Sequence, residues 1–209
     1  MAFLDIFRPK WRHSDPAIRM AAVKELGDEE MSTIERVLKE DPEASIRRVA
    51  LKRVSDTQLL LQLADADPDE ALRKNAADRA QQLLLDRALR GQDASQSLSA
   101  LEQLRSTRAL IDVAKKAGEQ AVREAALLRI TEQKALGELA RSADDPHIRH
   151  QATARLTDQA ALRDVALLDD AKDIALLATN KIGDKKVLAE IQKKARQKAR
   201  ASARLPKRA

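Results

Sequence analysis

Apolar residues recur at four-residue intervals in short stretches along this chain. Two stretches about a hundred residues apart, DPEASIRRVALKRVSD (41–56) and DPHIRHQATARLTD (145–158), share one order: apolar, Arg, two residues, Ala, three residues, apolar. Positions separated by four residues lie on one face of a helix, whereas a strand would alternate every second residue. Each stretch therefore predicts a short amphipathic helix.

The order occurs seven times in all. Five copies are complete, the copy that begins at Ile174 lacks the Arg, and the copy around Gln96 and Ser97 is degenerate. The alanine column of the seven copies is Ala22, Ala50, Ala76, Ala100, Ala126, Ala152 and Ala178, at intervals of 24 to 28 residues. A second apolar stretch follows most copies, at Leu60, Leu110, Leu136, Leu162 and Leu188. Each copy thus predicts two helices of about ten residues, which are too short to be stable alone in water and must pack on their neighbours.

Prolines and glycines support the division into short helices. Each of Pro16, Pro42, Pro68 and Pro146 follows an Asp. Because Asp is a preferred N-cap and Pro a preferred first helical residue, these pairs predict helix starts. Gly27 and Gly183 fall between the two helices of a copy, where a left-handed residue is expected to end the first helix.

Paired short helices at a fixed period are typical of an all-α solenoid, in which each pair buries its apolar face against the next. Over about residues 12–192 the sequence resembles the HEAT-like repeats of bacterial proteins, and its beginning resembles uncharacterised proteobacterial proteins. The resemblance implies a right-handed α-solenoid of about seven short helix pairs. We expect an N-terminal cap segment (1–14), the solenoid (15–192) and a basic C-terminal extension (193–209).

Composition narrows the chemistry. The chain is 44% apolar but only 1% aromatic, so its core must consist of Leu, Ala, Val and Ile, and it has no cysteine. Disulfides, thiol chemistry and Cys-based zinc sites are therefore excluded. No apolar run approaches the ~20 residues of a membrane span. We expect a cytoplasmic monomer without a cofactor.

An arginine follows the first apolar position in most copies, giving the column Arg19, Arg47, Arg73, Arg123 and Arg149. An Asp stands near the preceding turn in several copies. A guanidinium can form fork-like hydrogen bonds to carboxylate or carbonyl oxygens. We interpret these arginines as structural junctions between consecutive copies, in preference to a ligand-binding row.

The sequence favours neither catalysis nor a metal site. His147 and His150 are three residues apart on one expected helix, but the third histidine, His13, is far away in sequence. No nucleophile–base pair or glycine-rich phosphate loop is evident. Some HEAT-like proteins are DNA glycosylases, yet the aromatic residues that would surround a flipped base are confined to the N-terminus here. A base-excision enzyme is therefore only a lesser alternative.

Both ends of the chain carry candidate binding residues. Phe3, Phe7 and Trp11 form an apolar N-terminal segment that either covers the first helix pair or serves as an anchor for a partner groove or membrane surface. Residues 185–209 hold ten Lys or Arg and a single acidic residue, Glu190, so the rest of this +6 chain is mildly acidic. The candidate contacts for RNA, DNA, a ribosome or an acidic protein are Lys193, Lys194, Arg196, Lys198, Arg200 and Arg204.

The function expected from these observations is that of a non-enzymatic protein–protein interaction scaffold, because solenoid repeats serve many unrelated partners. The partner protein is expected along the second helices, which the resemblance implies form the concave surface. A nucleic-acid or ribosome-associated protein that uses the basic C-terminal helix remains the main alternative.

Overall fold

The computed structural model describes residues 7–202, with side chains up to residue 197. This part of the chain is all-helical: it contains thirteen α-helices and no strand, which confirms the predicted all-α class. The chain divides into two compact units, Met1–Leu84 and Leu85–Ala209. None of the described helices is both long and apolar enough to cross a bilayer.

The first unit contains a short 3₁₀ helix, η2 (Lys10–Arg12), followed by α1 (Pro16–Glu25), a second 3₁₀ helix, η3 (Asp28–Glu30), α2 (Met31–Glu40), α3 (Ala44–Leu51), α4 (Thr57–Ala66) and most of α5 (Glu70–Arg90). Its helices share one apolar core, in which Val23, Leu38, Ile46, Leu60 and Leu72 are buried. This core is aliphatic, as the composition predicts.

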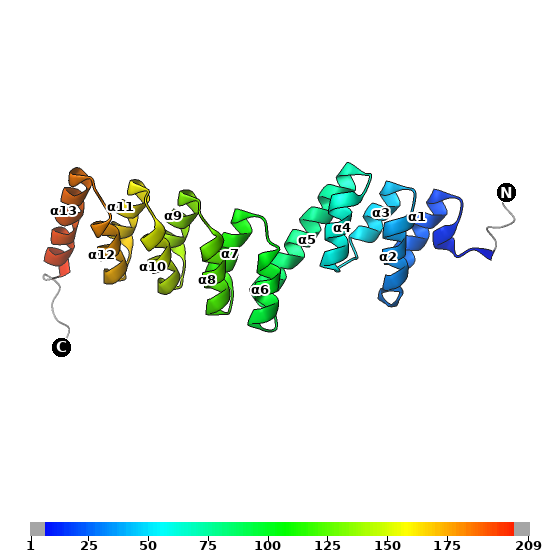
Figure 1. Cartoon of the computed structure of the whole chain (residues 1–209), viewed down its shortest axis with the longest axis horizontal. Helices are drawn as coiled ribbons and strands as arrows, with labels where there is room; N and C mark the ends of the chain where they lie inside the picture. Colours follow the sequence, from blue (N-terminus) through cyan, green and yellow to red (C-terminus); the bar gives the residue numbers. More distant parts are fainter. Residues whose placement is uncertain (1–6, 203–209) are drawn as a thin grey trace. The chain divides into compact units, whose positions relative to one another are not determined.

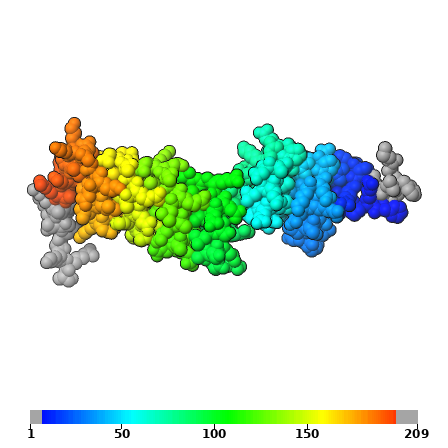
Figure 2. All heavy atoms as spheres, viewed as in Figure 1, coloured from blue at the N-terminus to red at the C-terminus, as the bar shows by residue number. Residues whose placement is uncertain are grey.

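The second unit contains α6 (Ala94–Glu102), α7 (Thr107–Lys116), α8 (Gln120–Arg129), α9 (Gln133–Ser142), α10 (Pro146–Arg155), α11 (Gln159–Leu168), α12 (Lys172–Asn180) and α13 (Lys185–Ser202). Helices α6, α8, α10 and α12 contact one another in succession, as do α7, α9, α11 and α13 (Figure 1). We call these sets the first-helix layer and the second-helix layer. On the face drawn in Figure 2, side chains fill the space between consecutive helices of this unit.

The alanine column lies where the first helices meet their neighbours. Ala126, Ala152 and Ala178 have no exposed surface. A small side chain at this position allows neighbouring helices to pack closely, and each larger apolar residue four positions away is buried on the same face. The four-residue spacing that predicted the helices is therefore the spacing of the core.

One helix differs from the expected pattern. The third copy was predicted to form two helices of about ten residues, but α5 continues without a break for 21 residues. Residues 81–90 contain no Gly or Pro, and buried Leu84 and Ala88 continue the four-residue spacing of Ala76 and Ala80. The apolar face and the helix therefore both extend through the position of the predicted turn.

The glycine prediction was also wrong. No described residue, glycine or other, has a positive φ. Helices α1, α8 and α10 instead end in a residue with extended ψ, as at Leu26 with ψ 135°, and Gly27 that follows has φ −78°. Helices α3, α6 and α12 end in a residue of right-handed helical conformation. The chain leaves these helices without a left-handed residue.

Two of the four Asp–Pro pairs begin helices as predicted. Asp15 and Asp145 are the N-caps of α1 and α10, and each accepts a hydrogen bond from the backbone N–H two residues later. Asp41 and Asp67 instead follow the ends of α2 and α4. Their carboxylates also accept from the backbone N–H two residues later, at 2.9 and 2.8 Å, which orders the turn before the next helix.

Candidate functional site

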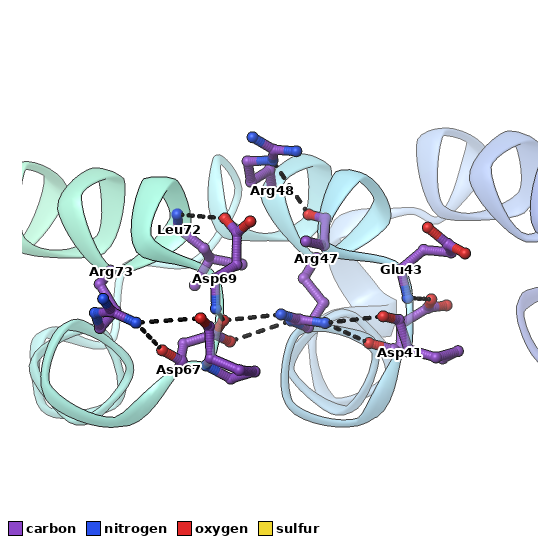
Figure 3. Close-up of polar contacts among 11 residues, drawn as sticks. Asp41, Glu43, Arg47, Arg48, Asp67, Asp69, Leu72 and Arg73 are labelled. Carbon is purple, nitrogen blue, oxygen red and sulfur yellow. Dashed lines mark hydrogen bonds and ion pairs between the residues drawn. The ribbon is translucent and has the colours of Figure 1, made fainter.

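Four of the five column arginines bond to an aspartate in the turn after the next second helix. We call these pairs the arginine brackets: Arg19–Asp41, Arg47–Asp67, Arg123–Asp145 and Arg149–Asp169. In the Arg47–Asp67 pair, Nε donates to one carboxylate oxygen at 3.1 Å and Nη2 to the other at 2.8 Å (Figure 3). Such two-point contacts between a guanidinium and a carboxylate fix orientation as well as distance.

The third nitrogen of each bracket arginine binds the turn before its own helix. Arg47 Nη1 donates to the carbonyl oxygens of Asp41 and Pro42, at 2.8 and 3.3 Å (Figure 3). Arg19, Arg123 and Arg149 make the same two contacts, to the residues six and five positions earlier. One arginine therefore holds two successive turns at a fixed separation.

The brackets are most enclosed in the first unit. The Arg47 and Asp67 side chains are only 7% and 5% exposed. Burial alone would raise the pKa of Asp67, but hydrogen bonds from Arg47 and the Asp69 backbone, and the charges of Arg47 and Arg73, outweigh it and hold that pKa below its ordinary value. The hydrogen bond to Asp41 is the main cause of the raised pKa of Arg19.

Arg73 makes only half of the bracket. Its Nη1 donates to the carbonyl oxygens of Asp67 and Pro68, at 2.7 and 3.2 Å (Figure 3). No bond from Arg73 to a later carboxylate is found among the described residues, and the helix that carries it is the uninterrupted α5. Loss of the turn within this copy explains the loss of the second contact.

A second set of cations, which the sequence reasoning missed, binds the opposite ends of the first helices. Arg129 on α8 donates to the Leu101 and Leu104 carbonyls at the end of α6, and Arg155 on α10 donates to the Leu127 and Ile130 carbonyls at the end of α8. Arg53 and Lys181 make equivalent contacts to Leu26 and Ala154. We call this set the carbonyl clamps; they add a charged donor to carbonyl groups at helix ends, two of which, Leu101 and Leu127, also accept a backbone N–H.

In the second-helix layer, charged side chains pair across neighbouring helices. Lys115 on α7 lies 2.7 Å from Glu138 on α9, and this hydrogen bond is the main cause of the lowered pKa of Glu138. Arg163 on α11 makes two bonds to Glu190 on α13, at 3.0 and 2.7 Å. These partly exposed pairs form a surface of mixed sign.

Exposed apolar side chains also occur on the second unit. Leu168, at the end of α11, is 74% exposed and borders a small pocket that Arg141 and Asp164 also line. Leu128 in the first-helix layer is 67% exposed.

The histidines take part in local contacts. His147 Nε2 lies 2.9 Å from Glu124 Oε1 on the neighbouring α8, His150 is exposed, and His13 Nδ1 accepts from the Asp15 backbone N–H at 2.9 Å. Within residues 7–202, no group of three or more His, Asp or Glu side chains is placed to hold a metal ion.

The two described aromatic residues of the N-terminus, Phe7 and Trp11, differ in exposure. Trp11 is half-buried against the core of the first unit, with the Arg12 guanidinium 4.6 Å from its ring centre. Phe7 is 83% exposed, and Phe3 lies outside the described residues. Trp11 therefore packs on the first helices, whereas Phe7 is exposed; an N-terminal anchor stays a prediction.

The basic residues of the C-terminal region lie on and beyond α13, which crosses the boundary at residue 193 expected from the sequence. Lys193, Lys194 and Arg196 are exposed, and Lys194 lies 3.5 Å from Glu190. The side chains of Lys198 and Arg200, and the whole of Arg204, lie outside the described residues.

Comparison with known proteins adds no relative to this geometry. No protein-family description matches the sequence, and no curated protein and no solved structure is significantly similar to it.

Proposed function

We propose that this chain is a HEAT-like α-solenoid that acts as a non-enzymatic scaffold for a partner protein, bound along the second-helix layer. The arginine brackets support the repeat assignment. Arg123–Asp145 and Arg149–Asp169 are the same contact displaced by about one period, and the Arg129 and Arg155 clamps are displaced by 26 residues. Interactions between neighbouring units are what stabilise a solenoid.

The observation that carries the proposed function is the mixed, partly ordered surface of α7, α9, α11 and α13. Cross-helix pairs such as Lys115–Glu138 and Arg163–Glu190 hold long side chains in place before any partner arrives. Ordering long side chains in advance reduces the entropy lost on binding. Exposed Leu168 offers an apolar contact among these charged side chains.

The test is affinity capture with the full chain from a nuclease-treated bacterial lysate, comparing Leu168→Glu with Leu128→Glu. Both leucines are highly exposed and belong to the second unit, but only Leu168 lies in the second-helix layer. We expect a defined protein to be lost with the first variant and retained with the second. Equal recovery by both variants, or loss with both, would contradict binding along the second helices.

A second candidate function, binding of nucleic acid through α13, is favoured by the exposure of Lys193, Lys194 and Arg196. Contacts from these cations to phosphates would be salt-sensitive and without sequence preference. A mobility-shift assay with single-stranded RNA at low salt, comparing the natural chain with a variant carrying Glu at all three positions, tests it. Unchanged RNA affinity in that variant would exclude these residues as the contact.

A further inference from the structure

The first unit contains a cationic pocket that the proposed scaffold surface does not include. Its volume is 520 Å³, and it lies between the C-terminal half of α3 and the middle of α5. The pocket is lined by Arg48, Leu51, Lys52, Asn75, Asp78, Arg79 and Gln82. Buried Leu51 belongs to the apolar core of this unit and fixes the base of the pocket.

The arginines of this pocket differ from the bracket arginines in their hydrogen bonds. Each bracket arginine donates to a carboxylate and to two carbonyl oxygens. Arg79 Nε, in contrast, is the one buried side-chain nitrogen or oxygen of the described region that has no hydrogen-bond partner. Burying a donor without an acceptor costs free energy, and more so for a charged group. Because Arg79 lines the pocket, its guanidinium has hydrogen-bonding capacity left for an acceptor that enters there.

The rest of the lining also favours an anionic ligand. Arg48 contacts only the Ala44 carbonyl of its own helix, through Nε at 3.3 Å, which leaves the outer edge of its guanidinium for a ligand. Lys52 is exposed at the same pocket. Three cations surround a single carboxylate, Asp78. Arg48, Arg79 and Lys52 together can receive one or two negative charges.

The two amides of the pocket distinguish between a peptide carboxylate and a phosphate. The charges do not, because the three cations attract a second negative charge as Asp78 repels it. The side chains of Asn75 and Gln82 each offer a donor and an acceptor, which match the C=O and N–H of a peptide group, whereas a phosphate offers acceptors alone. The volume also exceeds what one side chain needs and lies within the range of ordinary ligand sites.

We propose that this pocket binds an acidic segment of a partner protein, whose Asp or Glu carboxylate accepts hydrogen bonds from Arg79 and Arg48. The two amides and Asp78 bind the backbone that flanks this side chain. The inference rests on the proposed scaffold function, to which it adds the chemistry of the partner and a second contact site in the first unit.

The experiment measures fluorescence anisotropy of a labelled decaglutamate peptide at low salt, titrated with the full chain. Arg79→Met and Arg48→Met remove the donors and keep most of the side-chain volume. Lys74→Met, on the exposed side of α5 outside the pocket, is the matched control with the same change in charge. We expect each arginine variant to weaken peptide binding about tenfold and the lysine variant less than twofold. Because Arg79 Nε has no partner to lose, Arg79→Met is expected to retain the thermal unfolding midpoint.

A labelled decauridylate and inorganic phosphate as competitor complete the experiment. Tight binding of decauridylate that Arg79→Met abolishes, with no binding of decaglutamate, would overturn the proposal in favour of a phosphate ligand. Absence of peptide binding, or an equal loss with Lys74→Met, would overturn it as well. Efficient displacement of the peptide by phosphate at millimolar concentration would contradict the role assigned to the two amides, Asn75 and Gln82.

The pocket and the scaffold function can fail separately. Loss of the captured partner with Leu168→Glu, together with absent peptide binding, would leave the scaffold function standing and refute the pocket. Peptide binding that depends on Arg79, together with equal capture by Leu168→Glu and Leu128→Glu, would support the acidic-segment site and refute binding along the second helices.

Discussion

Asp67→Asn tests whether the arginine brackets hold the first unit together. The substitution removes the charge from a pair whose side chains are 7% and 5% exposed, while the amide keeps nearly the same volume. Arg47 then stays buried, with its Nε and Nη2 facing an amide in place of a carboxylate. Removing one partner of a buried pair costs about 3–5 kcal/mol, because the remaining charge has no counter-charge.

Two features of the structure reduce this cost. Arg47 Nη1 retains the carbonyl oxygens of Asp41 and Pro42, and the new amide oxygen can still accept from the Asp69 backbone N–H. We therefore expect a loss of about 2–3 kcal/mol in the free energy of unfolding. With an m-value of about 1–2 kcal/mol/M in urea, the midpoint should fall by about 1–3 M.

The assay is urea unfolding of the full chain followed by tryptophan fluorescence. Trp11 is the single tryptophan and contacts the core of the first unit, so its emission reports on the unit that contains the bracket. The matched control is Asp65→Asn, two residues earlier on an exposed position of α4, which should change the free energy by less than about 0.5 kcal/mol. If Asp67→Asn lowers the midpoint no more than Asp65→Asn does, the brackets do not stabilise the unit and this reasoning is wrong.

Three further predictions concern the rest of the chain. Arg155→Met removes the clamp on two carbonyl oxygens and should lower the free energy of unfolding of the second unit, measured by circular dichroism, by about 1–3 kcal/mol; no change would mean that water replaces the clamp without cost. Gly137→Leu places a side chain where a Cβ would already lie 3.1 Å from the Ala161 Cβ, so it should force α9 from α11 and lower the thermal midpoint, and an unchanged midpoint would show that the two helices separate freely. The pKa values of Asp67 and Asp145 are lowered from 3.8 in the folded chain, so the stability that these two groups contribute is present above pH 3.8 and is lost as the pH falls below it. Thermal midpoints measured from pH 6 to pH 3 should therefore fall at the acid end, and they should fall less steeply for Asp67→Asn than for the natural chain. Identical pH profiles for the two proteins would contradict this linkage.

The helices themselves could be predicted from the sequence, because the apolar spacing encodes them directly and two of the four Asp–Pro pairs begin a helix. The continuation of α5 could have been found too, since Leu84 and Ala88 keep the spacing of Ala80 through the expected turn. The sequence shows the missing turn only through the absence of Gly and Pro, whereas the regular period of the other copies predicts a turn at this position.

The contacts were harder to predict than the helices. The arginine column could be recognised because both partners are side chains, Arg and Asp, at regular positions. The carbonyl clamps could not be recognised in this way, because Arg129 and Arg155 bind backbone oxygens. Every residue has a backbone oxygen, so no particular residue type marks the acceptor in the sequence. The pocket around Arg79 combines residues of α3 and α5 that share no motif, so only the folded arrangement brings them together.

The short reach of the arginine brackets has a consequence for how such a chain can change during evolution. Arg123 pairs with a residue 22 positions later, and Arg149 with one 20 positions later, so neither bracket depends on distant parts of the sequence. Deleting residues 124–149 from the gene would leave Arg123 with Asp169 20 positions later, the same separation that Arg149 now has. Duplication or loss of one such segment would preserve the remaining contacts, so the number of helix pairs can vary by unequal recombination without redesign of any single junction.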